Sequence, residues 1–92
     1  MIRSFRCSET EALSKGERVR RFVHIASVAQ RKLRQLQIAG HLNDLRVPPG
    51  NRLEALKGDR LGRHSIRIND QWRICFRWTE AGAEDVEILD YH

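Results

Sequence analysis

Residues 64–78 have the sequence HSIRINDQWRICFRW, and the alternation within this stretch decides the fold. Mostly apolar or aromatic side chains occupy every second position on either side of a central Asn-Asp-Gln, with Ser, Cys and Arg between them. Because successive side chains of a strand point to opposite faces of a sheet, this period of two predicts two antiparallel strands with one apolar and one charged face.

The connection between these strands fixes which side chains face each other. A two-residue turn at 69–70 would set Ile66 opposite Arg73 and divide the apolar residues between the two faces. A three-residue connection at 69–71 sets Ile66 opposite Ile74 and keeps every apolar residue on one face. We therefore expect the three-residue connection.

This register brings arginines together on the charged face. Arg67 lies opposite Arg73, and Arg63 lies opposite Arg77. Like charges in directly opposed positions repel each other. We therefore expect an anion on this face.

A third strand offers an internal alternative to that anion, because Val86 and Ile88 alternate with Asp85 and Glu87. A five-residue connection at 79–83 would set Arg77 opposite Asp85, with Glu87 diagonal to Arg73 and Arg77. Arg77 is then an internal ion-pair partner. Arg67 and Arg73 lie further from these acids and remain candidates for phosphate.

The beginning of the chain predicts a strand followed by a short helix. Residues 2–7 alternate and predict the strand. Ser8 with Glu11 forms a capping-box pattern, which predicts a helix over about 9–15. Gly16 is the expected stop.

The clearest helix is predicted to begin at a second capping box, Ser27 with Gln30, and to end at Gly40. Apolar residues at spacings of three and four predict its buried face. They are Ile25, Ala29, Leu33 and Leu36.

The opposite face of this helix is expected to carry Arg31, Lys32 and Arg34. Two interpretations remain open for it: a solvated helix face, or a docking surface for an acidic partner. A helical turn is expected at 41–45, and the two prolines that follow predict an ordered loop through Gly62.

Together these elements predict an α+β fold in which N-terminal helices pack on one face of a twisted antiparallel sheet and leave the arginine face open. A chain of 92 residues has room for one hydrophobic core, so residues 1–92 are expected to form a single domain. The N-terminus lacks a long apolar run, which predicts a cytoplasmic protein without a membrane anchor.

The composition favours an anionic partner, RNA above all. The net charge is +5, and 14 of the 17 basic residues are Arg. Arginine's fork of donors suits phosphate oxygens, although an Arg-rich codon usage would give the same bias. Cys7 and Cys75 lack metal-ligand spacing and are expected to pack as small apolar residues.

The chain ends in Asp90, Tyr91 and His92, which can accept hydrogen bonds, stack on a base or transfer a proton. Histidine is the side chain best suited to proton transfer at neutral pH. From composition alone, a frayed terminus is the competing interpretation.

Several of these motifs occur together in a known family. LKGDR at 56–60, SIRIN at 65–69, WRI at 72–74 and DYH at 90–92 resemble the HigB-type toxins of the RelE/ParE superfamily, and MIRSF at 1–5 is similar to their N-terminus. The resemblance covers essentially the whole chain and implies a RelE-like fold. It also favours a functional His92.

The resemblance implies a toxin of a type II toxin–antitoxin module that enters the ribosomal A site and cleaves mRNA there. It implies neutralisation by a HigA-like helix-turn-helix antitoxin, contact with operator DNA only through that antitoxin, and no membrane partner. By position, Lys57 and Arg73 correspond to the phosphate-binding and transition-state-stabilising pair. Asp90, Tyr91 and His92 correspond to the cluster that orients the nucleotide and moves protons.

The implied reaction is attack of a ribose 2′-OH on the adjacent phosphate, which needs a base, an acid and cationic donors but no metal or cofactor. Arg60, Arg63 and Arg67 are the expected RNA-binding residues beside the catalytic set. One position departs from the family, because Glu54 stands where its well-known members have His. A carboxylate can act as a base but is a poor acid at neutral pH, so Glu54 is either a replacement base or the partner of an arginine.

Two other functions compete with this one. ParE-like members of the superfamily inhibit DNA gyrase, and such an inhibitor would not need Lys57, Arg73 or the terminal DYH. A non-enzymatic RNA-binding module would use the same arginines. It would lack a stacking platform, because Trp72 and Trp78 fall on the buried face.

Overall fold

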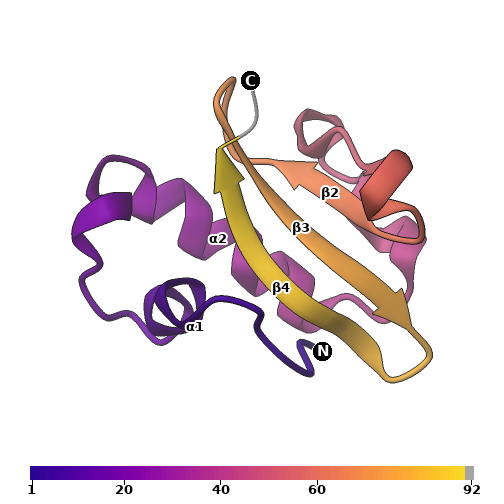
Figure 1. Cartoon of the computed structure of the whole chain (residues 1–92), viewed down its shortest axis with the longest axis horizontal. Helices are drawn as coiled ribbons and strands as arrows, with labels where there is room; N and C mark the ends of the chain where they lie inside the picture. Colours follow the sequence, from indigo (N-terminus) through magenta and orange to yellow (C-terminus); the bar gives the residue numbers. More distant parts are fainter. Residues whose placement is uncertain (91–92) are drawn as a thin grey trace.

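The structure is a computed structural model that describes residues 1–90. Two α-helices precede a four-stranded antiparallel sheet in the order β1-β2-β3-β4 (Figure 1). The predicted α+β fold, with helices on one face of an antiparallel sheet, is confirmed. Its elements are α1 Ser8–Ser14, α2 Ala26–Ile38, β1 Glu54–Ala55, β2 His64–Arg67, β3 Trp72–Thr79 and β4 Gly82–Asp90, with 3-10 helices η1 Arg20–Ile25, η2 Leu42–Arg46, η3 Pro49–Asn51 and η4 Gly58–Arg60.

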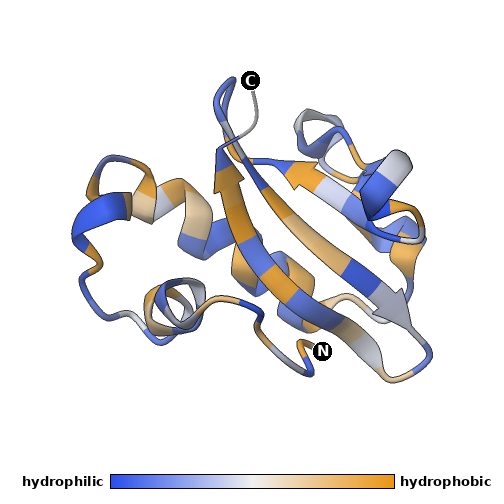
Figure 2. Ribbon diagram, viewed as in Figure 1, coloured by the Kyte–Doolittle hydropathy of each residue, from blue (hydrophilic) through white to orange (hydrophobic). Residues whose placement is uncertain are grey.

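The core lies between α2 and the apolar face of the sheet, and hydrophilic and hydrophobic residues alternate along part of β4 (Figure 2). All four residues of the predicted helix stripe are buried. The sheet contributes the other half of this core. Its fully buried residues include Ile66, Ile74, Phe76, Val86 and Ile88.

The predicted register of the first hairpin is confirmed, because Ile66 pairs with Ile74 and Arg67 pairs with Arg73. The Asn69 side chain stabilises the three-residue connection, since its Oδ1 accepts hydrogen bonds from the backbone amides at 71 and 72, at 2.8 and 2.7 Å. An Asx turn of this kind explains why asparagine occupies the position.

The predicted second connection is wrong near the turn. Thr79 pairs with Gly82, so the turn has two residues, and Arg77 faces Glu84 instead of Asp85. A β-bulge restores the predicted register further along, where Cys75 pairs with Glu87. Asp85 lies at this irregularity with a left-handed φ of 54°.

Residues 2–7 do not form the predicted continuous strand. Ile2 and Phe5 make isolated parallel bridges to β4, because the bulge at Asp85 interrupts the edge against which they pair. Close approach here requires glycine at 82, where a Cβ would lie 2.0 Å from the Met1 carbonyl oxygen.

Neither predicted capping box is formed. α1 has Cys7 at its N-cap position, without a side-chain hydrogen bond. α2 follows η1 directly, so the chain is already helical before Ser27 and has no exposed helix N-terminus there. Both helices nevertheless lie within a few residues of their predicted positions, and the turn predicted at 41–45 is η2.

Two further expectations need correction. The loop predicted through Gly62 contains a two-residue strand, β1, in which Glu54 pairs with Ser65. Lys32 is buried at 7% exposure, although it was expected on the solvated face of α2. It lies three residues after Ala29 and four before Leu36, on the flank of the buried stripe. Within residues 1–90, no helix is long and apolar enough to cross a bilayer.

Candidate nucleic-acid interface

The charged face of the sheet is less open than predicted, because Ser65 and Cys75 at its centre are completely buried. The pKa of the Cys75 thiol is raised to about 11, mainly by burial; Glu87 contributes to the rise, and nearby Arg60, Arg73 and Arg63 oppose it. These charges therefore gather around Cys75. The thiol itself packs as a small buried group, as expected of a free cysteine.

One end of this face is internally neutralised. Arg63 is 9% exposed, and its guanidinium lies 3.3 Å from a Glu87 carboxylate oxygen and 3.4 Å from Asp85. Arg6 approaches the same Glu87 oxygen at 3.5 Å. Arg77 belongs to this end too. We call this group the compensated cluster: Arg6, Arg63, Arg77, Glu84, Asp85 and Glu87.

Arg77 is an ion-pair partner, as the sequence predicted, although its partner differs. Its Nη2 lies 2.8 Å from Glu84 and 3.9 Å from Asp85. The hydrogen bond to Glu84 is the main cause that raises the pKa of Arg77. The compensated cluster thus contains three arginines and three carboxylates, which leaves no excess charge for a polyanion.

The other end contains Arg73, which is held mainly by uncharged oxygens. Its Nε donates to Ser65 Oγ at 2.7 Å, and its Nη2 donates to the carbonyl of Arg52 at 2.7 Å. Glu54, half exposed, lies 3.7 Å from Nε. We call this group the Arg73 cluster: Arg73, Ser65, Glu54 and the Arg52 carbonyl. It fixes the guanidinium without a close, buried carboxylate among the residues described.

The loop carbonyl in this cluster has its own support. Arg52 adopts a left-handed conformation with φ 46°. The preceding residue, Asn51, is fully buried; it accepts a hydrogen bond from Lys32 Nζ and donates to the carbonyl of Leu45 at 3.0 Å. A buried network of this kind over-determines a strained backbone position. Asn51 therefore helps to present the Arg52 carbonyl to Arg73.

Arg67 lies across the register from Arg73 and pairs with Asp70, which is almost fully exposed. Its charge also acts on Lys32, whose pKa is lowered first by burial and then by Arg31 and Arg67. Basic side chains therefore continue from Arg73 on β3 to Arg67 on β2.

The remaining predicted site residues do not all lie on the same face of the sheet as Arg73. Lys57 is exposed at the start of η4, and Arg60 at its end reaches toward Cys75. Asp90 pairs with Trp72, and so shares the parity of the helix-covered face and not that of Arg73; its Oδ2 accepts from Gln71 at 3.0 Å. Tyr91 and His92 lie outside the described residues.

Sequence reasoning missed Ser65, Asn51 and the Arg52 carbonyl. Ser65 could have been found, because the predicted register sets it opposite Cys75, diagonal to Arg73. The other two depend on loop geometry that has no periodic pattern. Among residues 1–90, no three His, Cys, Asp or Glu side chains gather as a metal site would require.

Comparison with known proteins identifies the family. The model of the RelE-like toxin of the type II toxin–antitoxin system HigB matches residues 13–92. The chain belongs to the HigB-like toxins. Members of a type II system act with an antitoxin, so the family implies an antitoxin partner for this toxin.

Two known proteins are similar to this chain over most of its length. Toxin HigB-1 of Vibrio cholerae serotype O1 is 49% identical to this toxin over 62 residues, which are 67% of this chain and 64% of that protein. A protein of Haemophilus influenzae is 36% identical over 69 residues, 75% of this chain and 67% of its own length. The chain thus matches a little under two thirds of the length of the Vibrio relative.

Proposed function

We propose that this HigB-like toxin is a ribosome-dependent mRNA endoribonuclease that inhibits translation by cleaving mRNA in the A site. The observation that carries the proposal is the fixed position of the Arg73 guanidinium on the charged face. Its Nε donates to Ser65 Oγ, and its Nη2 donates to the carbonyl of Arg52. A fixed guanidinium is suited to stabilising charge that develops on a phosphate.

The proposed reaction is attack by the ribose 2′-OH on the adjacent phosphorus, with departure of the 5′ oxygen of the next nucleotide, and it uses no metal. Arg73 stabilises the negative charge on the phosphate in the transition state. Lys57 binds the same phosphate, and Arg60 and Arg67 bind its neighbours along the strand. Arg63 is left out of this proposal, because Asp85 and Glu87 already neutralise it.

Proton transfer is assigned to the end of the chain, with His92 as the acid or base and Asp90 and Tyr91 orienting the nucleotide. For Glu54, the contact with Arg73 supports the ion-pair interpretation. Glu54→Gln should then retain cleavage within about threefold of the wild-type rate, since an exposed ion pair contributes little. If Glu54→Gln abolished cleavage while the bound ribosome fraction stayed unchanged, Glu54 would be the base.

The partners proposed are the ribosome, its mRNA and a HigA-like helix-turn-helix antitoxin in the cytoplasm. The antitoxin would carry the toxin to operator DNA. The family supports an antitoxin of some kind. The basic side chains at this end of the sheet face, Arg73 and Arg67, and the exposed Lys57 support a phosphate backbone as substrate.

The direct experiment mixes purified toxin with ribosomes translating a defined mRNA and maps new 5′ ends by primer extension. We expect cuts within codons at the A site, present without divalent-metal addition beyond that needed by the ribosome, and a loss of at least about 100-fold with His92→Ala. Intact mRNA together with inhibition of gyrase supercoiling would instead support the ParE-like function. Ribosome binding without cleavage would support the non-enzymatic RNA-binding module.

A further inference from the structure

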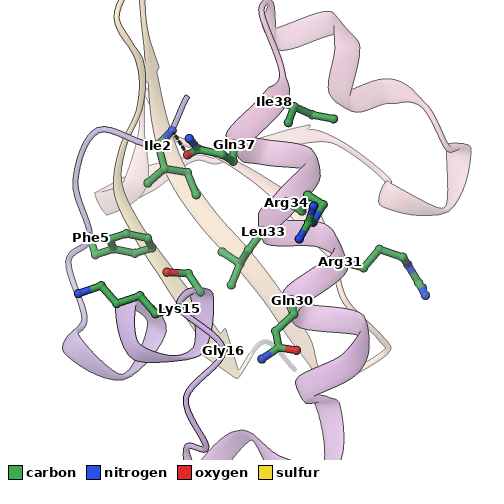
Figure 3. A pocket seen from close by; sticks show the side chains of 11 residues that line it. Ile2, Phe5, Lys15, Gly16, Gln30, Arg31, Leu33, Arg34, Gln37 and Ile38 are labelled. Carbon is green, nitrogen blue, oxygen red and sulfur yellow. Dashed lines mark hydrogen bonds between the residues drawn. The ribbon is translucent and has the colours of Figure 1, made fainter.

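A groove lies on the helical side of the molecule, away from the Arg73 cluster. It has a volume of about 720 Å³ and is bounded by α1, α2 and the N-terminal segment beside β4. Figure 3 shows Ile2 and Phe5 on one wall and Leu33 of α2 facing them. The floor of the groove is therefore apolar.

Hydrogen bonds between its walls hold the groove open in a fixed form. Gln37 Oε1 accepts from the backbone amide of Ile2 at 2.9 Å, which joins α2 to the N-terminal segment (Figure 3). Gln30 Nε2 donates to the carbonyl of Leu13 at 3.2 Å, which joins α2 to α1. A preformed groove reduces the entropy lost when a partner binds.

The rim of the groove is basic. Lys15, Arg31 and Arg34 line it, and none of the described residues that line it is acidic. Lys15 approaches Glu11 at 3.7 Å, whereas Arg31 and Arg34 are exposed and make no ion pair with any residue from 1 to 90. Ile38, 75% exposed, extends the apolar surface at the end of α2.

We propose that this groove is the docking site of an acidic amphipathic segment of the antitoxin. Its apolar side chains would lie on Ile2, Phe5 and Leu33, and its carboxylates would pair with Arg31 and Arg34. An apolar floor with a rim of one charge is the complement of an amphipathic helix of the opposite charge. The inference rests on the antitoxin partner that the family implies, and it does not depend on the nuclease chemistry.

The location has a consequence for inhibition. α2 packs on the apolar face of the sheet, so the groove and the Arg73 cluster lie on opposite sides of it. An antitoxin segment in the groove would therefore not cover the Arg73 cluster, and inhibition would not depend on contact with that cluster.

The test measures binding of the purified antitoxin encoded beside this gene by titration calorimetry. The groove variant is Arg31→Glu with Arg34→Glu, and the matched control is Arg18→Glu with Arg20→Glu, which makes the same charge change at exposed arginines outside the groove. We expect the groove variant to weaken binding by about 100-fold or more and the control to stay within about threefold. Ile38→Asp should weaken binding by about tenfold.

Circular dichroism verifies that each variant is folded. The proposal is overturned if Arg31→Glu with Arg34→Glu binds the antitoxin as tightly as wild type. It is also overturned if Arg67→Glu on the sheet face abolishes binding while the groove variant does not, or if the groove variant changes only self-association of the toxin. None of these readouts uses mRNA cleavage, so the nuclease function can fail without affecting the result.

Discussion

The two ends of the charged sheet face contain the same type of residue and differ in what surrounds it. In the compensated cluster, every guanidinium has a carboxylate within 3.5 Å. In the Arg73 cluster, a hydroxyl and a backbone carbonyl accept hydrogen bonds from the guanidinium at 2.7 Å. A row of arginines therefore does not by itself predict an anion site, because carboxylates built into the fold neutralise some of its members.

Exposure would have given the opposite assignment. The Arg77 side chain is 53% exposed, yet Glu84 and Asp85 neutralise it. The Arg73 side chain is only 11% exposed, and hydrogen bonds to a hydroxyl and a backbone carbonyl fix its guanidinium. Pre-organised charge of this kind is what a reacting phosphate requires.

The largest expected effect tests the compensated end. Glu87→Ala would leave the buried guanidinium of Arg63 with only the more exposed Asp85 as its carboxylate, and we expect it to lower the free energy of unfolding by about 3 kcal/mol, the low end for a broken buried ion pair. Glu54→Ala, beside Arg73, removes a half-exposed partner and should change stability by about 1 kcal/mol or less. Urea denaturation measures both. Equal losses of stability in Glu87→Ala and Glu54→Ala would contradict the proposed difference between the two ends of the sheet face.

A smaller effect concerns RNA affinity. Arg67→Ala should lower the slope of log affinity against log salt concentration by about 0.7 for a single-stranded RNA, whereas Arg77→Ala should leave the slope unchanged. The reason is that two carboxylates, Glu84 and Asp85, lie beside Arg77, whereas the partner of Arg67 is the almost fully exposed Asp70, whose ion pair is weak. Between about 50 and 200 mM salt, this change in slope corresponds to a change of about two- to threefold in relative affinity, which fluorescence anisotropy can resolve. If Arg77→Ala lowered the salt slope and Arg67→Ala did not, the assignment of the two ends of the sheet face would be reversed.

The smallest expected effect is a dependence of stability on pH, which comes from Lys32. Burial and then Arg31 and Arg67 lower the pKa of Lys32 from its ordinary 10.5. A folded chain that binds fewer protons than the unfolded one becomes more stable as pH rises, so the burial penalty is complete below the folded pKa and is relieved as pH rises through it toward 10.5. Relative to Lys32→Met, wild type should gain stability over this interval.

Thermal denaturation at a series of alkaline pH values measures this gain, and Lys15→Met at an exposed position is the control. The difference between wild type and Lys15→Met should show no such rise. A constant difference between wild type and Lys32→Met would mean that Lys32 keeps its ordinary pKa in the folded chain.

The hairpin and its arginine row could be predicted from sequence, because a period of two and one permitted connection fix the register of Ile66 against Ile74. The buried stripe of α2 could be predicted for a similar reason, since its spacing is regular. The family motifs indicated Arg73 and Lys57 before any geometry was known.

The remaining details depend on tertiary contacts that have no local pattern. β1 has only two residues, and it exists because Glu54 and the residue after it pair with β2. Asp85 adopts a positive φ, which the sequence does not predict because non-glycine residues rarely have one. The bulge at this position shifts the register, so Arg77 faces Glu84. Lys32 is buried because Asn51, 19 residues away, offers it a hydrogen bond.

The most direct test of the account compares two single arginine variants on opposite ends of one sheet face. Cleavage of ribosome-bound mRNA is measured in single-turnover reactions with Arg73→Ala and Arg77→Ala, after both are shown to be folded and to bind ribosomes. We predict that Arg73→Ala lowers the rate about 100- to 1,000-fold and that Arg77→Ala changes it about twofold or less. Equal rates for the two variants, or a greater loss with Arg77→Ala, would contradict the assignment of Arg73 as the catalytic arginine.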